Sequence, residues 1–384
     1  MKNILLVFGG KSYEHDISVV TAMQIYQKVK TDGFKLHLLY VSRENKLFLY
    51  ESKSVNQSDF AVHKFSEKNK SFKQVEFVFG EKKKLFARSV LGLKEYLIID
   101  AAIFACHGGN GENGWLVSLF KQMDIPVSCG SVEGLGICMN KFLFKQTMKG
   151  LKVPVVKGFK IEKREIKDKS KKEKIELKLR LLKFPVVIKA NGGGSSIGVF
   201  VAKNMEEFNY MLCQAFDFDN VVLVEKFIDN AREFNIAVLG DGDVCQVSEI
   251  DEPLKKEELL TFADKYLSGA KTKGAKTGSM ENLRKRITTG VPIEVFSKMK
   301  DYALKIFKGL NLYGVVRIDF LYSEKLKKVY VCEANAIPGS LAYYFFNQGH
   351  VVINEFVERL IEIAEKNHLN EQMFKSDFVT DILK

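Results

Sequence analysis

The stretch KNILLVFGGKSYEHDISVVTAMQIYQKV, residues 2–29, indicates the fold class. The apolar run Ile4–Phe8 is typical of a buried strand, and the pair Gly9-Gly10 forms a loop after it. From Asp16 onward, apolar residues recur at the spacing of one helix face. A strand, a glycine loop and a helix in this order predict an α/β unit with a ligand-binding edge where the strand ends.

Further strand patterns extend this unit to about residue 135. Leu36–Val41 predicts a second strand, and the almost wholly apolar run Tyr96–Cys106 predicts a third that is buried on both faces. Between them, residues 43–95 mix polar and aromatic side chains and predict no particular elements. We therefore expect an N-terminal domain, residues 1–135, with an open and mostly parallel sheet.

Two more domains are expected in the rest of the chain. The central domain, residues 136–224, should contain a helix, a lysine-rich helix or insertion, and three strands: Lys141–Lys149, 160–183, Pro185–Ala190, Gly198–Ala202 and Val221–Glu225. The C-terminal domain, residues 225–384, should contain a strand, a long polar loop, a helix and a hairpin: Glu233–Leu239, 251–290, Val295–Leu310, Gly314–Leu321 and Lys328–Asn335. A polar loop of that length inside a compact domain is usually functional or disordered.

Composition favours a soluble, cytoplasmic globular protein. Hydrophobic residues make up 46% of the chain, no apolar run approaches the roughly 20 residues of a membrane helix, and no signal peptide is recognisable. The six cysteines are scattered without a CxxC pair, which is typical of reduced core thiols. The net charge of +12 would suit nucleic acid or anionic small molecules, but the lysine run 160–183 is poor in arginine and, over 160–180, has no interleaved aromatic residue. We therefore interpret these lysines as solvated helix faces and expect neither a nucleic-acid nor a membrane partner.

The clearest chemical pattern lies on the C-terminal hairpin. Side chains alternate between the two faces of a strand, so Arg317 shares a face with Asp319, and Glu333 shares a face with Asn335. A turn through residues 323–327 would bring these four side chains together. Two carboxylates and an amide oxygen suit Mg²⁺ that also contacts phosphates, and the guanidinium suits a phosphoryl group or an oxyanion. The alternative is that this face of the hairpin is simply solvated.

A glycine-rich loop, residues 192–196, joins two of the expected strands. It lacks the Gly-Lys-Ser/Thr of a Walker loop, but the amide groups of successive glycines can still surround a phosphate. Lys189 ends the preceding strand and could reach the same phosphates. The alternative is a plain tight turn.

Two loops that follow N-terminal strands should open on the same edge of the sheet. One is Gly9–His15, which contains Glu14, and the other is His107–Gly114. The first loop does not match GxGxxG, so a dinucleotide is disfavoured. The alternative for Glu14 is a favourable interaction with the helix dipole alone.

Taken in order, these segments resemble the D-alanine–D-alanine ligases of the ATP-grasp superfamily. The resemblance covers nearly the whole chain and is carried by FGGKSYEHDIS, HGGNGENG, MNK at 139–141, VVIKANGGGSSIGV, LVEKFID with REF, DKY at 264–266, and RIDF with VYVCEANAIPGS. It implies a three-domain ATP-grasp architecture with ATP held between the second and third domains. The implied cofactors are ATP and two Mg²⁺ ions, which Mn²⁺ could replace.

The resemblance also implies roles for particular residues. In the ATP site, the phosphates would be bound by Lys141, Lys189, Ser196 and Lys265. The adenine would be held by Glu225, Lys226 and Ile228, and the ribose by Glu233. The metal ligands would be Asp319, Glu333 and Asn335. The catalytic group would comprise Glu14 on the ammonium of the first D-alanine, Ser195 and Tyr266 in a hydrogen-bonded chain with it, and Arg317 with the amide of Gly339 on the oxyanion. His107 would lie near the first D-alanine, and Ser340 or Tyr344 would hold the second.

The implied activity is the ligation of two D-alanine molecules for peptidoglycan precursor synthesis. The carboxylate of the first D-alanine would take the γ-phosphate of ATP, and the amine of the second would attack the resulting acyl phosphate under a lid formed by loop 251–290. We expect the enzyme to be a homodimer. Asn113 and Asn140 replace aspartates that are usual in the family, and the segment after Pro338-Gly339 departs most from its pattern.

Three other interpretations were open at this stage. The nearest is another ATP-grasp carboxylate–amine ligase with a different acceptor. The second is a basic nucleic-acid-binding protein, which would leave the hairpin and the glycine loop unexplained. The third is a pseudo-enzyme, which the presence of Lys141, Lys189 and the three metal-ligand candidates disfavours.

Overall fold

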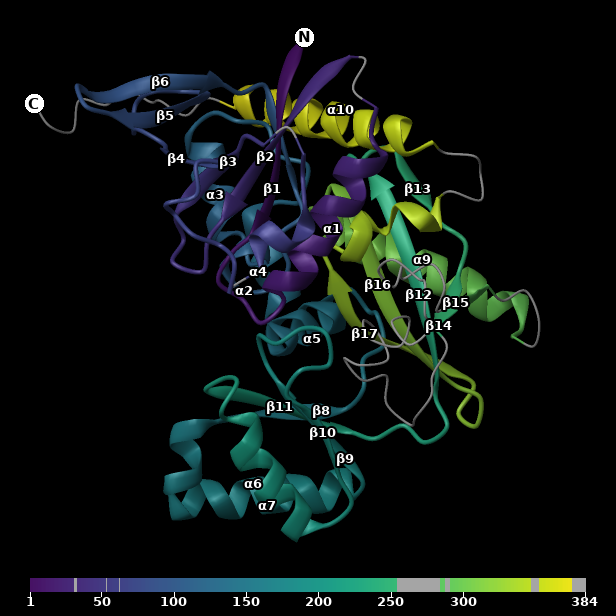
Figure 1. Ribbon diagram of the computed structural model, residues 1–384. Helices are drawn as coiled ribbons and strands as arrows, with labels where there is room; N and C mark the ends of the chain where they lie inside the picture. Colours follow the sequence, from purple (N-terminus) through teal and green to yellow (C-terminus); the bar gives the residue numbers. More distant parts are fainter. Residues whose placement is uncertain are drawn as a thin grey trace, which may run out of the picture.

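The computed structural model describes residues 1–30, 33–52, 54–61, 63–253, 284–286, 291–346 and 352–374, and the strands in these ranges form three sheets (Figure 1). Most of the expected lid, loop 251–290, lies outside the described residues, and so do Lys265 and Tyr266. Within the described ranges, no helix is long and apolar enough to cross a membrane.

The N-terminal sheet has seven strands in the order β6-β5-β4-β3-β2-β1-β7. The strands are β1 (Lys2–Gly9), β2 (Phe34–Val41), β3 (Leu47–Tyr50), β4 (Phe72–Glu76), β5 (Lys84–Ser89), β6 (Gly92–Ile98) and β7 (Ala101–Phe104). β2, β1 and β7 are parallel, whereas β3 to β6 extend the sheet with antiparallel pairs. The α/β class is therefore confirmed, but the sheet is mixed rather than mostly parallel, because the region without recognisable patterns supplies antiparallel strands.

The expected single strand Tyr96–Cys106 is wrong. β6 ends at Ile98 and is an exposed edge strand, with Tyr96 41% and Ile98 51% exposed, whereas β7 is fully buried next to β1. The break is fixed by Asp100, whose carboxylate accepts from the Asn3 amide at 2.7 Å while its own amide donates to the Asn3 carbonyl at 2.9 Å. The sequence prediction failed because the exposed edge strand β6 and the buried strand β7 both contain apolar residues, so the sequence shows one continuous apolar run.

The carboxyl ends of β1 and β7 are joined side by side. Ser18 on α1 (His15–Lys28) accepts from the Gly9 amide at 2.7 Å and donates to the Ala105 carbonyl at 2.7 Å. Gly9 has a φ of +91°, and a Cβ there would overlap the Val41 carbonyl oxygen, so the turn out of β1 requires glycine. The remaining N-terminal helices are η1 (Gln57–Phe60), α2 (Gly109–Glu112), α3 (Trp115–Gln122) and α4 (Val132–Met139).

The central unit is a four-stranded antiparallel sheet with helices packed against it. α5 (Lys141–Gly150) leads into the sheet, whose order is β10-β9-β11-β8: β8 (Gly158–Glu162), β9 (Val186–Ala190), β10 (Val199–Ala202) and β11 (Val221–Lys226). The lysine-rich segment forms η2 (Lys163–Lys167) and α6 (Lys169–Leu182), and α7 (Met205–Ala215) follows β10. Among the residues of α6 only Leu179 is buried, as expected for a solvated helix.

The C-terminal sheet has the order β15-β14-β12-β16-β17, and β13 also pairs with β12. Its strands are β12 (Arg232–Gly240), β13 (Cys245–Val247), β14 (Asp251–Pro253), β15 (Arg284–Arg286), β16 (Gly314–Ser323) and β17 (Lys328–Asn335), and its helices are α9 (Ile293–Gly309), η4 (Gly339–Phe345) and α10 (Ile353–Gln372). β16 and β17 form the predicted hairpin. In Figure 1, α10 lies across the N-terminal part of the molecule, and it contacts β7 and α1 as well as β16.

The described residues form two hydrophobic cores. One is shared by the N-terminal and C-terminal sheets and includes Leu6, Phe104, Ile318 and Leu360. The other lies within the central unit, between its sheet and α6 and α7. The domain boundaries at residues 135 and 224 remain a prediction, but the packing joins the first and third units more closely than either is joined to the second.

Candidate active site

A cavity of about 460 Å³ opens where the three sheets meet, a volume typical of small-molecule sites. Most of the predicted site residues line it: Glu14, His107, Lys141, Lys189, Ser195, Ser196, Glu225, Lys226, Ile228, Glu233, Arg317, Asp319, Glu333, Asn335 and Gly339. The cavity therefore joins the carboxyl edge of the N-terminal sheet to the inner faces of the other two sheets.

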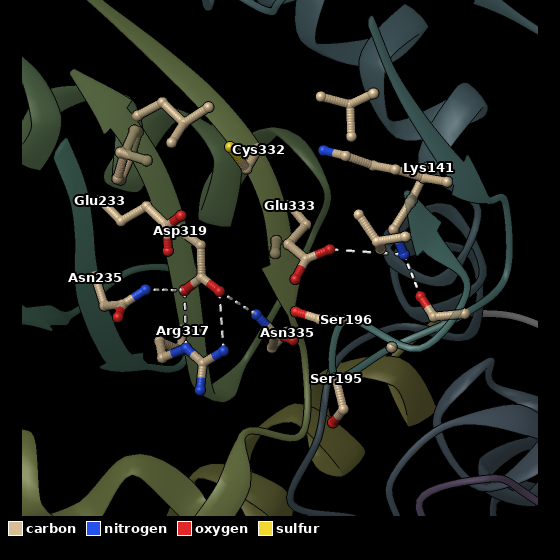
Figure 2. Close-up of a pocket in the computed structure, with 18 of the residues that line it drawn as sticks. Lys141, Ser195, Ser196, Glu233, Asn235, Arg317, Asp319, Cys332, Glu333 and Asn335 are labelled. Carbon is tan, nitrogen blue, oxygen red and sulfur yellow. Dashed lines mark hydrogen bonds and ion pairs between the residues drawn. The ribbon is translucent and has the colours of Figure 1, made fainter. Parts of the chain in front are cut away.

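Asp319 lies at the centre of a polar cluster on the C-terminal sheet (Figure 2). Arg317 donates from Nε and Nη2 to its two carboxylate oxygens at 2.8 and 2.9 Å. Asn235 donates to Oδ1 at 2.5 Å and Asn335 donates to Oδ2 at 3.1 Å. Asp319 pairs with Glu333 across the hairpin, and Arg317 pairs with Asn335, so the predicted gathering on one face is confirmed.

The donors in this cluster fit a magnesium ion. Within the described part of the chain, no three His, Cys, Asp or Glu side chains group as a metal site, and the third oxygen ligand here would be the amide of Asn335. Two carboxylates and an amide oxygen are hard ligands of the kind that Mg²⁺ shares with substrate phosphates. Both oxygens of Asp319 already accept hydrogen bonds, so binding of a cation would require the Arg317 fork to open.

Lys141 connects the glycine loop to this cluster. It begins α5, where Asn140 caps the helix by accepting from the Leu143 amide at 3.0 Å. Its Nζ donates to the carbonyl of Gly193 and lies 3.6 Å from Oε2 of Glu333, and Figure 2 shows the contact with Glu333. An ammonium group between a glycine loop and a carboxylate is well placed to meet phosphate oxygens.

A buried ion triad forms another wall of the cavity. Glu225 Oε2 lies 2.9 Å from Nζ of Lys189, and Oε1 lies 2.6 Å from Nζ of Lys145. Burial acts to raise the pKa of Glu225, but the two ammonium groups outweigh it and the pKa is lowered. Burial acts to lower the pKa of Lys189, and the Glu225 carboxylate outweighs it, so that pKa is raised. Glu225 and Lys189 are therefore both charged at neutral pH.

Glu14 and Ser195 meet at the opposite end of the cavity. Ser195 Oγ donates to Oε1 of Glu14, which links the N-terminal domain to the glycine loop. A Cβ on Gly194 would overlap the Glu14 carboxylate, so the loop can approach Glu14 only with glycine there. Glu14 does not cap α1 with its side chain. Its carboxylate is directed into the cavity, which favours a binding role over an interaction with the helix dipole alone.

The segment 337–340 is anchored from the N-terminal domain. The Ile337 amide donates to Glu112 Oε1 at 3.3 Å, and the imidazole of His107 also hydrogen-bonds the Ile337 backbone. Thr21 Oγ1 accepts from the Ser340 amide at 3.0 Å and lies 2.8 Å from His107 Nε2. These contacts hold the backbone on both sides of Gly339, which lines the cavity together with Arg317.

Burial shifts the pKa values of both titratable anchors. It lowers the pKa of His107 to about 4, so the imidazole is neutral at pH 7. Burial, together with the neighbouring Glu14 carboxylate, raises the pKa of Glu112 to about 7. The two hydrogen bonds that Glu112 accepts, from Gly108 at 2.9 Å and from Ile337, act in the opposite direction and favour its charged form.

Comparisons with known proteins agree with this geometry. The family model described as "D-ala D-ala ligase N-terminus" matches residues 3–130, and the one described as "D-ala D-ala ligase C-terminus" matches residues 147–362. The chain belongs to the D-alanine–D-alanine ligase family. It is 30% identical to the D-alanine–D-alanine ligase of Thermosipho melanesiensis over 384 residues, which covers 100% of this chain and 99% of that protein.

Solved structures show the same fold. The D-alanine–D-alanine ligase of Coxiella burnetii has a TM-score of 0.77 at 23% identity, with 97% of this chain and 96% of that chain covered. The Bacillus anthracis ligase, whose structure is described as complexed with ATP, has a TM-score of 0.65 at 20% identity, with 97% of this chain and 100% of that chain covered. The chain is thus a ligase with the ATP-grasp fold, of an ATP-dependent family.

In this ligase, the two candidate residues for the second substrate lie outside the cavity that most other predicted site residues line. Ser340 and Tyr344 are buried in η4 and do not line the cavity. Ser340 Oγ donates to Gln24 Oε1 at 2.5 Å, and Lys28 on the same helix donates to the hydroxyl of Tyr343. The predicted contacts of Ser340 and Tyr344 with the second D-alanine stay predictions, because both side chains are buried where η4 packs against α1. Lys265 and Tyr266 lie outside the described residues.

Three residues of the site were missed by sequence reasoning. Asn235 lies opposite Asp319 on β12, and a polar residue in the run Glu233–Leu239 was the available signal. Lys145 follows Lys141 by one helical turn, so the helix periodicity alone could have placed both on one face. Glu112 gave no signal beyond its motif, because its partner Ile337 is 225 residues away.

Proposed function

We propose that this ligase joins two D-alanine molecules into D-alanyl-D-alanine, with conversion of ATP to ADP and phosphate, for peptidoglycan precursor synthesis. The observation that carries the proposal is that one cavity contains a carboxylate for an ammonium group, cationic side chains for phosphates, and hard oxygen ligands. Glu14, Lys141, Lys189 and Asp319 supply these groups from three different units. The proposal further places the enzyme in the cytoplasm, as a homodimer without a nucleic-acid or membrane partner.

Asp319, Glu333 and Asn335 would hold Mg²⁺, which would neutralise phosphate charge when bound. Lys141 and Lys189 bind phosphate oxygens, and the Lys141–Glu333 contact of 3.6 Å puts the cationic and anionic ends of this site next to each other. The adenine and the ribose occupy the part of the cavity lined by Glu225 to Glu233.

Glu14 would bind the ammonium group of the first D-alanine and direct its carboxylate toward the γ-phosphate. Ser195 orients Glu14 through their hydrogen bond. The carboxylate oxygen displaces ADP from the γ-phosphorus and gives an acyl phosphate, because a free carboxylate is a poor acyl donor. Lys189 and Arg317 stabilise the charge that develops during this transfer.

The amine of the second D-alanine then attacks the acyl carbon, and inorganic phosphate leaves after the tetrahedral intermediate. The Gly339 amide and the Arg317 guanidinium stabilise the oxyanion, provided that the Arg317 fork opens from Asp319. His107 and Glu112 also position the Gly339 backbone, in addition to the expected place of His107 near the first D-alanine. On the expected lid, Lys265 would bind phosphate and Tyr266 would join the hydrogen-bonded chain with Ser195 and Glu14; both roles rest on the resemblance alone.

Phosphate release with ATP and Mg²⁺ tests the proposal when measured over a panel of D- and L-amino acids and D-lactate, with products identified by mass spectrometry. We expect phosphate and dipeptide in equal amounts with D-alanine alone, and much less with the L-amino acids. If D-alanine supports efficient phosphate release only when a different acceptor is also present, the enzyme is instead a carboxylate–amine ligase with another second substrate. No release with any D-amino acid would refute both.

A further inference from the structure

A second lysine lies behind the wall of the ATP part of the cavity. Lys145 belongs to α5, which lies between the N-terminal unit and the central sheet in Figure 1, and its side chain is 5% exposed. It contacts the oxygen of Glu225 that faces away from Lys189. Lys189 and Glu225 line the cavity, whereas Lys145 does not. One buried carboxylate therefore bridges a lysine in front of the wall and a lysine behind it.

The buried carboxylate of Glu225 needs a cationic partner at all times. Glu225 is 2% exposed, and a buried carboxylate without a counter-ion is strongly unfavourable. If Lys189 turned toward a phosphate and Glu225 had no second partner, the carboxylate would be left uncompensated. Lys145 removes this conflict, because its ion pair of 2.6 Å persists whether or not Lys189 stays.

We propose that Lys145 is a positioning residue for ATP, which keeps Glu225 neutralised and thereby releases Lys189 to bind the nucleotide's phosphates. This inference rests on the proposed function, since it requires ATP in the cavity. It assigns no contact between Lys145 and the nucleotide. Because Lys145 acts on the nucleotide only through Glu225, the effect of removing Lys145 should depend on whether Glu225 is charged.

The test measures ATP and ADP binding by calorimetry with Mg²⁺ and without D-alanine, in wild type, Lys145→Met, Glu225→Gln and the double variant. Lys145→Met should weaken nucleotide binding about tenfold, as expected when a charge-assisted hydrogen bond is diverted. In steady-state assays the KM for ATP should rise by a similar factor, while kcat at saturating ATP and the KM for D-alanine change little. Lys149→Met removes an exposed lysine from the same helix and should change none of these constants.

The double variant makes the inference falsifiable even if Lys145→Met folds poorly. Once Glu225 is neutral, Lys189 is already free, so removal of Lys145 in the Glu225→Gln background should leave the nucleotide Kd unchanged. A further several-fold loss in that background would overturn the proposal, and so would a wild-type Kd in Lys145→Met. If the wild-type protein itself bound no ATP or ADP, the proposed function would be refuted rather than this inference.

Discussion

Glu112→Gln should change the pH dependence of stability by a predictable amount. Glu112 is buried beside Glu14, and its pKa rises from 4.5 to about 7 in the folded protein. At about 1.4 kcal/mol for each pH unit, this rise corresponds to about 3 kcal/mol of differential free energy. The folded state holds the proton more tightly than the unfolded chain, so the free energy of unfolding falls as pH rises from about 4.5 to about 7, and the full loss persists above that pH.

Glutamine has nearly the same shape and carries no charge, so the variant should not show this loss. Because the amide can replace only one of the two acceptor oxygens, the variant should be about 1 kcal/mol less stable than the wild-type protein with Glu112 protonated, and this loss does not change with pH. The difference in unfolding free energy, variant minus wild type, should therefore increase by about 3 kcal/mol between pH 4.5 and pH 8. The variant becomes the more stable protein at the upper end of this range.

Urea unfolding at pH steps, without nucleotide or divalent cations, measures this difference directly. Glu176→Gln on the exposed face of α6 is the control, and its difference from wild type should stay constant with pH. A constant difference for Glu112→Gln as well would refute the claim that burial and Glu14 hold this carboxyl in its protonated form near neutrality.

Other perturbations test the remaining parts of the site. Gly194→Ala should raise the KM for the first D-alanine at least about tenfold while nucleotide binding stays normal, because the new Cβ displaces the Glu14 carboxylate; an unchanged KM contradicts the role of Glu14. Asp319→Ala or Glu333→Ala should abolish dipeptide formation without unfolding the protein, and near-normal turnover at millimolar Mg²⁺ would exclude these residues as metal ligands. Tyr344→Phe should raise the KM for the second D-alanine about tenfold if its hydroxyl binds that carboxylate. Ser340→Ala provides the comparison: if it lowers only the melting temperature, through loss of the bond to Gln24, and neither variant changes the KM, the carboxylate is held elsewhere.

The parts of the fold and the site that depend on local sequence were predictable. Strand alternation placed Arg317 and Asp319 on one face of their strand and Glu333 and Asn335 on one face of theirs, and the turn predicted the hairpin. The pairing of Asp319 with Glu333 also depends on a register shift between Asp319 and Phe320, which the turn length alone does not predict. The antiparallel strands of residues 43–98 were not predictable in this way, because they share no pattern of burial: β4 buries only Phe72 and Val75, and β6 is exposed along almost its whole length.

Long-range polar contacts were beyond the sequence patterns for a different reason. No periodicity links Glu112 to Ile337 or Lys145 to Glu225, since the members of each pair lie on different elements that meet only through tertiary packing. The hydroxyl of Ser340 illustrates the same limit. Its position next to Gly339 suggested a substrate contact, but tertiary packing turned it toward α1.

The core shared by the first and last sheets has a consequence for synthesis on the ribosome. Lys121 donates to Glu371, which is 250 residues further along the chain, and α10 packs against β7 only after nearly all of the protein has been made. The N-terminal unit must therefore wait with part of its apolar surface uncovered, whereas the central unit closes its own core as soon as it emerges. The middle of this enzyme should be the first part to reach its native state, and chaperones that recognise apolar surface should engage the nascent N-terminal unit for longest.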